Sequence, residues 1–253
     1  MNILLEKEDR TAFVSFQRPP LNVLNISMMG ELRQVLEEVD GDSEMDFLVL
    51  RGDGDRAFSA GVDIKEHTRE KVPEMLDVVH GVIRKLFTIR QITIAVVRGA
   101  CLGGGWELAS SCDLVLASEE SIFATPEITV GCYPPVALAR FPSLMGYHRA
   151  AETILTGRRY SAREAHAFGM VNRVVPTGEL EQAMDTLLDE LKRQSAAVLR
   201  IALRGLREIS LGSLSEALKK SERIYIDELL KTEDVEEGVR AFLDKRKPQW
   251  SHR

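Results

Sequence analysis

Two glutamates with apolar neighbours are the strongest chemical feature of the sequence. Glu107 lies between Trp106 and Leu108, and Glu127 lies in the segment 125–131, which reads TPEITVG. Two carboxyl groups in a partly dry pocket can hold one water molecule and differ in pKa, so that one accepts a proton and the other donates one. Most glutamates are instead solvated or cap helices. The pair indicates acid–base chemistry, provided that the fold brings the two groups together.

Two glycine-containing loops each follow a predicted strand. The first spans 57–65, AFSAGVDIK, and its small residues let a ligand approach the backbone, although an ordinary loop has the same composition. The second spans 99–109, GACLGGGWELA, where three glycines precede helix formers. That pattern predicts a helix whose first N–H groups are unpaired and suit negative charge, or glycines that permit close helix–sheet packing. Neither loop is a GxGxxG or a Walker motif, so no standard nucleotide-phosphate site is indicated.

Other catalytic patterns are not found in the sequence. The five histidines form no HExxH motif and no metal-ligand spacing with the cysteines, so we expect no metal site. There is no GxSxG motif for a serine hydrolase. Cys101, Cys112 and Cys132 lie among apolar or small residues and are predicted to be buried structural thiols. Their odd number and lack of CxxC spacing favour a reducing, cytoplasmic location over a disulfide-built secreted protein.

Composition limits the class of protein. The chain has 253 residues, of which 44% are hydrophobic, enough for one main domain with a substantial core. A net charge of -6 without a long basic run argues against nucleic acid or an anionic membrane as the main partner. Charges interrupt the N-terminus too early for a signal peptide. The most apolar stretch, 92–109, contains Arg98, Glu107 and four glycines, so no membrane span is expected.

The apolar periodicity predicts an α/β core followed by helices. A hairpin is expected at 3–5 and 13–16, and then a helix with Ser27 as N-cap and an apolar face from Met28 to Val39. Continuous apolar runs predict buried strands, and the helical spacing over 75–87 favours a parallel pairing of the two strands that flank it. The predicted strands are 47–50, 92–97, 114–117 and 171–175, and the predicted C-terminal helices are 180–193, 196–209, 214–230 and 235–245. This helical tail is expected to wrap the core or to pack on another subunit, which favours an oligomer.

The two loops and the two glutamates, in this order, resemble the enoyl-CoA hydratase/isomerase family, also called crotonases. The likeness extends over nearly the whole chain and includes RPPLN at 18–22, LTG at 155–157, AREA at 162–165 and EGVRAF at 237–242. It implies a crotonase-like (ClpP/crotonase) α/β fold in which repeated ββα units form a spiral core. Residues 1–178 would form this core with its acyl-CoA site, and residues 179–253 would form a helical oligomerisation region. The family also implies a homotrimer or a dimer of trimers.

The resemblance assigns roles to particular residues. The backbone N–H groups of Val62 and Gly104 match the two donors that hold the thioester carbonyl oxygen in the family. Glu107 and Glu127 match the glutamates that orient and activate water in the hydratases. No cofactor is expected, because CoA is part of the acyl-CoA substrate. The remaining predicted substrate-binding residues are Ala60, Gly61, Asp63, Ile64, Gly103, Trp106, Tyr133 and Pro135, with Lys65 or a basic C-terminal residue near the CoA phosphates.

One segment departs from the ordinary fatty-acid hydratases. They continue after PEI with a glycine-rich PGAGG stretch, whereas this chain reads GCYPPVAL over 131–138. Tyr133, Pro135 and Trp106 are therefore expected to reshape the acyl pocket, or else to serve packing. The segment and the C-terminal motifs look most like the members that hydrate cyclohexa-1,5-diene-1-carbonyl-CoA to 6-hydroxycyclohex-1-ene-1-carbonyl-CoA in anaerobic benzoyl-CoA degradation. The alternatives are a straight-chain hydratase, an isomerase with a single Glu, or a catalytically silent scaffold or RNA-binding member of the fold.

Overall fold

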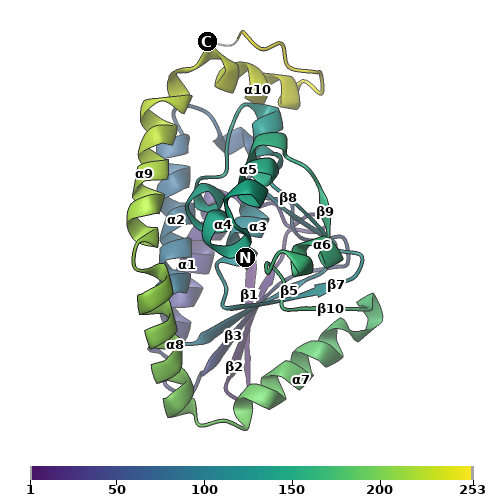
Figure 1. Cartoon of the computed structure of the whole chain (residues 1–253), viewed down its shortest axis with the longest axis vertical. Helices are drawn as coiled ribbons and strands as arrows, with labels where there is room; N and C mark the ends of the chain where they lie inside the picture. The colour runs from purple at the N-terminus through teal and green to yellow at the C-terminus, as the bar shows by residue number, and fades with distance from the viewer. Residues whose placement is uncertain (1, 252–253) are drawn as a thin grey trace.

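A six-stranded sheet runs through the centre of the molecule. The structure is a computed structural model and describes residues 2–251. The strand order is β1-β2-β3-β5-β7-β10, in which only β1 pairs antiparallel to its neighbour (Figure 1). The strands are β1 (Ile3–Glu8), β2 (Thr11–Phe16), β3 (Phe47–Gly52), β5 (Ile92–Val97), β7 (Leu114–Ser118) and β10 (Arg173–Val175). The hairpin and the parallel pairing of β3 with β5 are confirmed, while β10 is two residues shorter than predicted.

A second sheet of short strands was not predicted. It has the order β4-β6-β8-β9 and consists of β4 (Ala57–Ser59), β6 (Ala100–Leu102), β8 (Ile122–Ala124) and β9 (Tyr160–Ser161). Each of the long strands β3, β5 and β7 is followed by one of these short strands and then by helical structure. This is the predicted repetition of ββα units. The two glycine-containing loops include β4 and β6 and lead from them into the helical structure that follows. Because β4 and β6 pair in the second sheet, the two loops lie side by side.

The helices that follow each unit cover the two sheets. They are α1 (Ile26–Gly41), α2 (Val72–Thr88), α3 (Gly104–Ser110), α4 (Pro135–Met145), α5 (Tyr147–Thr156) and α6 (Ala162–Ala167), with short 3₁₀ turns at Ile64–Glu66, Pro126–Val130, Thr177–Glu179 and Leu229–Lys231. The predicted N-cap of α1 is corrected: α1 begins at Ile26, and the Asn25 side chain accepts the Met28 N–H at 2.9 Å. Ser27 lies one position inside the helix and is exposed.

The central sheet is buried on both faces, which explains its continuous apolar runs. Leu48 and Leu50 of β3 point into the larger core, whereas Phe47 and Val49 point into a second cluster on the opposite face. Side chains of α7 complete that second cluster. Because successive side chains of a strand point to opposite faces of the sheet, each strand contributes alternate residues to each of the two clusters.

The C-terminal helices wrap the core of their own chain. They are α7 (Leu180–Lys192), α8 (Ala196–Leu211), α9 (Leu214–Asp227) and α10 (Glu233–Leu243). The long α9 runs beside α2 and packs on α4 (Figure 1). The predicted helix 214–230 is shorter than expected, because α9 ends at Asp227 before a 3₁₀ turn. Among residues 2–251, no helix is both long and apolar enough to cross a membrane.

Candidate active site

The first loop is fixed by backbone hydrogen bonds to the segment before α1. The Ala60 N–H donates to Leu21 at 2.9 Å, and the Leu24 N–H donates to the Gly61 carbonyl at 2.9 Å. Gly61 has φ +96°, and a Cβ there would lie 2.9 Å from the Leu102 carbonyl oxygen. Only glycine combines this conformation with so close an approach. The result is a rigid turn that carries Val62 to the start of α3.

Gly103, Gly104 and Gly105 of the second loop each lie close to a different neighbour. A Cβ on Gly103 would lie 2.4 Å from Glu127 Oε1, and one on Gly105 would lie 2.5 Å from the Ser59 carbonyl oxygen. A Cβ on Gly104 would meet Val62 Cγ2 at 2.8 Å and the Val62 nitrogen at 3.5 Å. Both functions predicted for these glycines are therefore present. Gly105 permits close packing on the second sheet, while Gly104 brings the start of α3 against the first loop. The N–H groups of Val62 and Gly104 are neighbours and donate to no acceptor in the described chain.

Glu107 is buried and held by the start of α4. Its side chain projects from α3, is 4% exposed, and Oε1 accepts the Ala137 N–H at 2.9 Å. Burial raises the pKa of Glu107 above its usual value, and the Ala137 and Val136 backbone N–H groups oppose part of that rise. The first turn of α4 thus orients the carboxyl group and favours its ionised form.

Glu127 lies in the 3₁₀ turn Pro126–Val130, and its surroundings are less polar. Its Oε2 atom is buried and has no hydrogen-bond partner among the described residues. Burial, and then the charge of Glu107, raise the pKa of Glu127. When two buried carboxyl groups lie close enough for the charge of one to raise the pKa of the other, the pair holds one proton near neutral pH. This is the state needed to accept a proton from water and return one to carbon.

One cavity collects most of the predicted site residues. The predicted residues that line it are Ala60, Gly61, Val62, Gly103, Gly104, Glu107, Glu127, Tyr133 and Pro135. The rest of the lining was not among the predicted site residues and consists of His67, Met75, Leu76, Val79, His80, Pro126, Pro134 and Tyr225. Met75, Leu76 and Val79 belong to the apolar face predicted for 75–87. Helical spacing identified that face but gave no sign that part of it borders a cavity instead of the core.

Tyr133 and Tyr225 form one wall of this cavity. Their rings meet edge to face with centroids 5.0 Å apart, and the Tyr133 hydroxyl donates to the Ser221 carbonyl at 2.8 Å. Tyr225 and Ser221 both lie on α9. The 131–138 segment therefore shapes the cavity as expected, and α9 holds its tyrosine in place.

Trp106 does not line the cavity, which corrects the prediction that it reshapes the acyl pocket. Its indole is 1% exposed and packs against Phe123 and Phe141, with ring centroids 5.5 and 4.8 Å away. On α3, consecutive residues point about 100° apart, so Glu107 faces the cavity while Trp106 faces the core. The packing alternative is the one that the structure supports.

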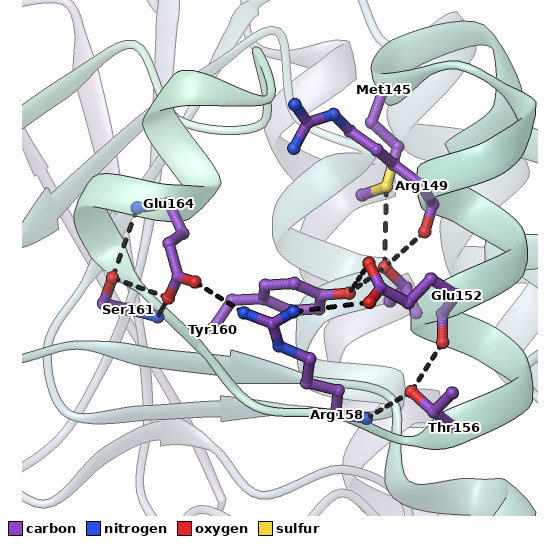
Figure 2. Close-up of polar contacts among 9 residues, drawn as sticks. Met145, Arg149, Glu152, Thr156, Arg158, Tyr160, Ser161 and Glu164 are labelled. Carbon is purple, nitrogen blue, oxygen red and sulfur yellow. Dashed lines mark hydrogen bonds and ion pairs between the residues drawn. The ribbon is translucent and has the colours of Figure 1, made fainter.

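Tyr160 joins the second sheet to the helices beside Trp106. Its hydroxyl lies 3.1 Å from Thr153 Oγ1, and Figure 2 shows its ring between Glu152 of α5 and the capping box that Ser161 forms with Glu164. Arg158 pairs with both carboxylates, at 3.3 and 2.9 Å. This network fixes β9 and α6 at the edge of the core that supports α3.

Three further predicted contacts, Asp63, Ile64 and Lys65, lie outside the lining. Asp63 caps the turn Ile64–Glu66, where its Oδ1 accepts the Lys65 N–H at 3.1 Å. Ile64 is partly buried against the larger core, and Lys65 is exposed. Their predicted contacts with CoA stay predictions.

The cysteines have the predicted buried surroundings. Cys101, Cys112 and Cys132 are free and buried. Burial raises the pKa of all three thiols, that of Cys132 to about 11. Such thiols are protonated near neutral pH and are poor nucleophiles. Within residues 2–251 the structure holds no group of three or more His, Cys, Asp or Glu side chains arranged for a metal ion.

The fold and the paired loops define a class of protein, and comparison with known proteins gives the same class. The sequence model of the enoyl-CoA hydratase/isomerase family matches residues 6–253, and the chain belongs to this family. Its crotonase fold is confirmed by the crystal structure of an enoyl-CoA hydratase from Mycobacterium avium subsp. paratuberculosis K-10. That structure has a TM-score of 0.90 and 28% identity, and the match covers 99% of both chains.

Two relatives have names that specify a reaction. A probable enoyl-CoA hydratase of Mycobacterium bovis is 35% identical over 99% of this chain and 98% of its own length. A cyclohexa-1,5-dienecarbonyl-CoA hydratase of Thauera aromatica is 29% identical over 100% of this chain and 97% of its own length. The predicted enzyme class, a hydro-lyase of the enoyl-CoA hydratase type, is confirmed at this level.

Proposed function

We propose that this enzyme adds water to a cyclic dienoyl-CoA, converting cyclohexa-1,5-diene-1-carbonyl-CoA to 6-hydroxycyclohex-1-ene-1-carbonyl-CoA. The observation that carries the proposal is the cavity wall made by Tyr133, Pro134 and Pro135 and closed by Tyr225. A wall of two aromatic rings and two rigid proline rings favours a flat ring as ligand over a flexible chain. The relative from Thauera aromatica is named a cyclohexa-1,5-dienecarbonyl-CoA hydratase.

The chemistry assigned to the site follows from where charge develops. Attack of water on a double bond conjugated to a thioester builds enolate charge on the thioester oxygen. The neighbouring N–H groups of Val62 and Gly104 would hold that oxygen, and removal of one such donor typically costs about 3 kcal/mol of barrier. Glu107 and Glu127 would hold the water on the other side of the acyl group, one of them accepting its proton.

The CoA portion has a candidate path beside the first loop. A groove between residues 67–70 and α10 shares His67 with the cavity and is lined by Arg69 and Arg240. Arg240 is a basic C-terminal residue of the kind predicted, and we expect these two guanidinium groups to meet the CoA phosphates. Arg69 is paired with Glu236 at 3.0 Å, so this contact would require exchange of partners.

A straight-chain enoyl-CoA hydratase is the second candidate. The probable hydratase of Mycobacterium bovis favours it, and the same donors and glutamates would serve a linear substrate. Met75, Leu76 and Val79 would then contact the chain.

Product analysis separates the two candidates. Purified protein is incubated in parallel with cyclohexa-1,5-diene-1-carbonyl-CoA and with crotonyl-CoA, and products are identified by mass and retention time. A kcat/KM at least tenfold higher for the cyclic diene, with one water added, supports the proposal. Efficient turnover of crotonyl-CoA alone would refute the cyclic substrate and retain the hydratase chemistry.

A further inference from the structure

We propose that His80 is a third proton-transfer residue of this site, which delivers the proton to the ring carbon remote from the attacking water. The inference rests on the proposed cyclic substrate and goes beyond it. His80 lies on α2 and lines the same cavity as Glu107 and Glu127, which come from α3 and from the 3₁₀ turn at 126–130. It therefore reaches the cavity from a different wall.

His80 is buried and has a carboxylate partner. Its side chain is 1% exposed, and Nδ1 lies 2.6 Å from Oε1 of Glu222 on α9. Arg84, one helical turn further along α2, pairs with the same carboxylate oxygen. The whole group joins α2 to α9 behind the cavity wall that holds Tyr225.

The partner determines which ring nitrogen carries the proton. Burial raises the pKa of Glu222, but the hydrogen bonds and charges of His80 and Arg84 outweigh it and hold the pKa below its usual value. An ionised carboxylate only accepts hydrogen bonds, so Nδ1 of His80 is the donor. Nε2 is then the ring nitrogen left to exchange a proton, as in other histidines that a carboxylate orients.

His67, the other histidine in the lining, lacks this arrangement. Its Nδ1 meets the Asp63 carbonyl oxygen at 3.1 Å, and burial lowers its pKa. A neutral imidazole without a carboxylate partner is the poorer proton donor. The geometry therefore singles out His80.

The cyclic diene needs a proton donor that a simple enoyl-CoA does not. The hydroxide part of water bonds to C2, the carbon β to the thioester, while the glutamate pair takes the proton. Electrons move onto the thioester oxygen and are delocalised over C1, C6 and C5. A C5–H bond then forms with the proton from Nε2 of the His80 imidazolium, leaving C1=C6, which is C1=C2 of the renumbered product. C2 and C5 lie opposite each other in the ring, so a proton donor on a second wall of the cavity fits this step. The proton that the glutamates took from water then returns to His80 through water.

The test compares two reactions in one protein. Wild type, His80→Asn and the control His166→Asn are assayed on the cyclic diene and on crotonyl-CoA, where the new C–H bond lies next to the thioester. Asn keeps a donor for Glu222 but has no counterpart of Nε2, and His166 is an exposed residue of α6. We expect His80→Asn to lose at least 100-fold in kcat on the diene and less than threefold on crotonyl-CoA. In D₂O, wild type should place deuterium at C3 of the product, which is C5 of the diene.

The outcomes separate the two proposals. Two results would overturn the role of His80 and leave the cyclic substrate intact. One is normal hydration of the diene by His80→Asn. The other is an equal loss of kcat on both substrates together with weakened binding of cyclohexanecarbonyl-CoA. Glu222→Gln, which keeps a hydrogen-bond acceptor, should lose about tenfold on the diene only. Wild type that hydrates crotonyl-CoA but not the diene would refute the cyclic substrate and, with it, this role.

Discussion

The two catalytic carboxyl groups differ in what their oxygens meet. Glu107 receives backbone N–H groups from the first turn of α4, whereas Oε2 of Glu127 has no partner among the described residues. The single shared proton is therefore better placed on Glu127, with Glu107 ionised as the base toward water. The pair still titrates as a unit, so macroscopic pKa values belong to both groups.

The rate of crotonyl-CoA hydration, in which the glutamate pair would supply both the base and the acid, should depend on pH in a bell-shaped manner. Burial raises the pKa of Glu107 to about 7 and, with the charge of Glu107, that of Glu127 to about 8. Below this window both groups are protonated and no base remains; above it both are ionised and no acid remains. The profile of kcat between pH 5 and 10 should peak between these values. A flat profile over that range would contradict a shared proton.

Gly103 should tolerate no side chain. Its φ is +53°, and a Cβ would lie 2.4 Å from Glu127 Oε1. Gly103→Ala must displace the carboxyl group, and we expect kcat to fall at least 100-fold while the fold persists. Circular dichroism provides the check on folding. Gly178→Ala is the matched control, because a Cβ there meets nothing within 4 Å; equal activity of both variants would contradict the tight fit at Gly103.

At this scale, the sequence contained the glutamate pair and the glycine run but not their surroundings. Loop glycines and apolar-flanked glutamates form a local pattern. The roles of Trp106 and His80 depend on which way a buried side chain points, and neither flanking residues nor spacing reveals that. The same holds for the Ala137 N–H, which reaches Glu107 from thirty residues away.

The helical elements depend on their caps, and α1 gives a direct comparison. Asn25 accepts the Met28 N–H, so Asn25→Ala should lower the free energy of unfolding by about 1 kcal/mol. Ser27→Ala, at the position predicted for the cap, should change it by less than about 0.5 kcal/mol. Urea unfolding of both variants measures the difference. A larger loss for Ser27→Ala would restore the original assignment.

Long, periodic elements were predictable and short strands were not. The strands β4, β6, β8 and β9 have two or three residues each. So few residues cannot show the alternation of apolar and polar side chains that distinguishes a strand from a loop. These strands form because they pair with one another across ββα units. The ends of α9 and β10 were also misplaced, as element boundaries fray and carry weak local signals.

On the scale of the whole molecule, the helical tail covers its own core yet leaves apolar residues exposed. Val198, Ile201, Leu206 and Ile209 of α8 are between 62% and 87% exposed. Exposed apolar residues on one helix favour an interface. We predict a trimer or a dimer of trimers, so sedimentation equilibrium should give three or six times the 28.3 kDa of one chain. A monomer at micromolar concentration would contradict this, and the cytoplasmic location stays a prediction.

The central claim, that Glu107 and Glu127 act together on one water molecule, is tested most directly by kcat for Glu107→Gln and Glu127→Gln. Glutamine keeps the size of the side chain and removes proton transfer, so each variant should lose about 10²- to 10⁴-fold in kcat. The dissociation constant for a saturated acyl-CoA should stay within about threefold, since Val62 and Gly104 still hold the thioester. If either variant hydrates its substrate at a rate near that of wild type, the shared role of the two carboxyl groups is wrong.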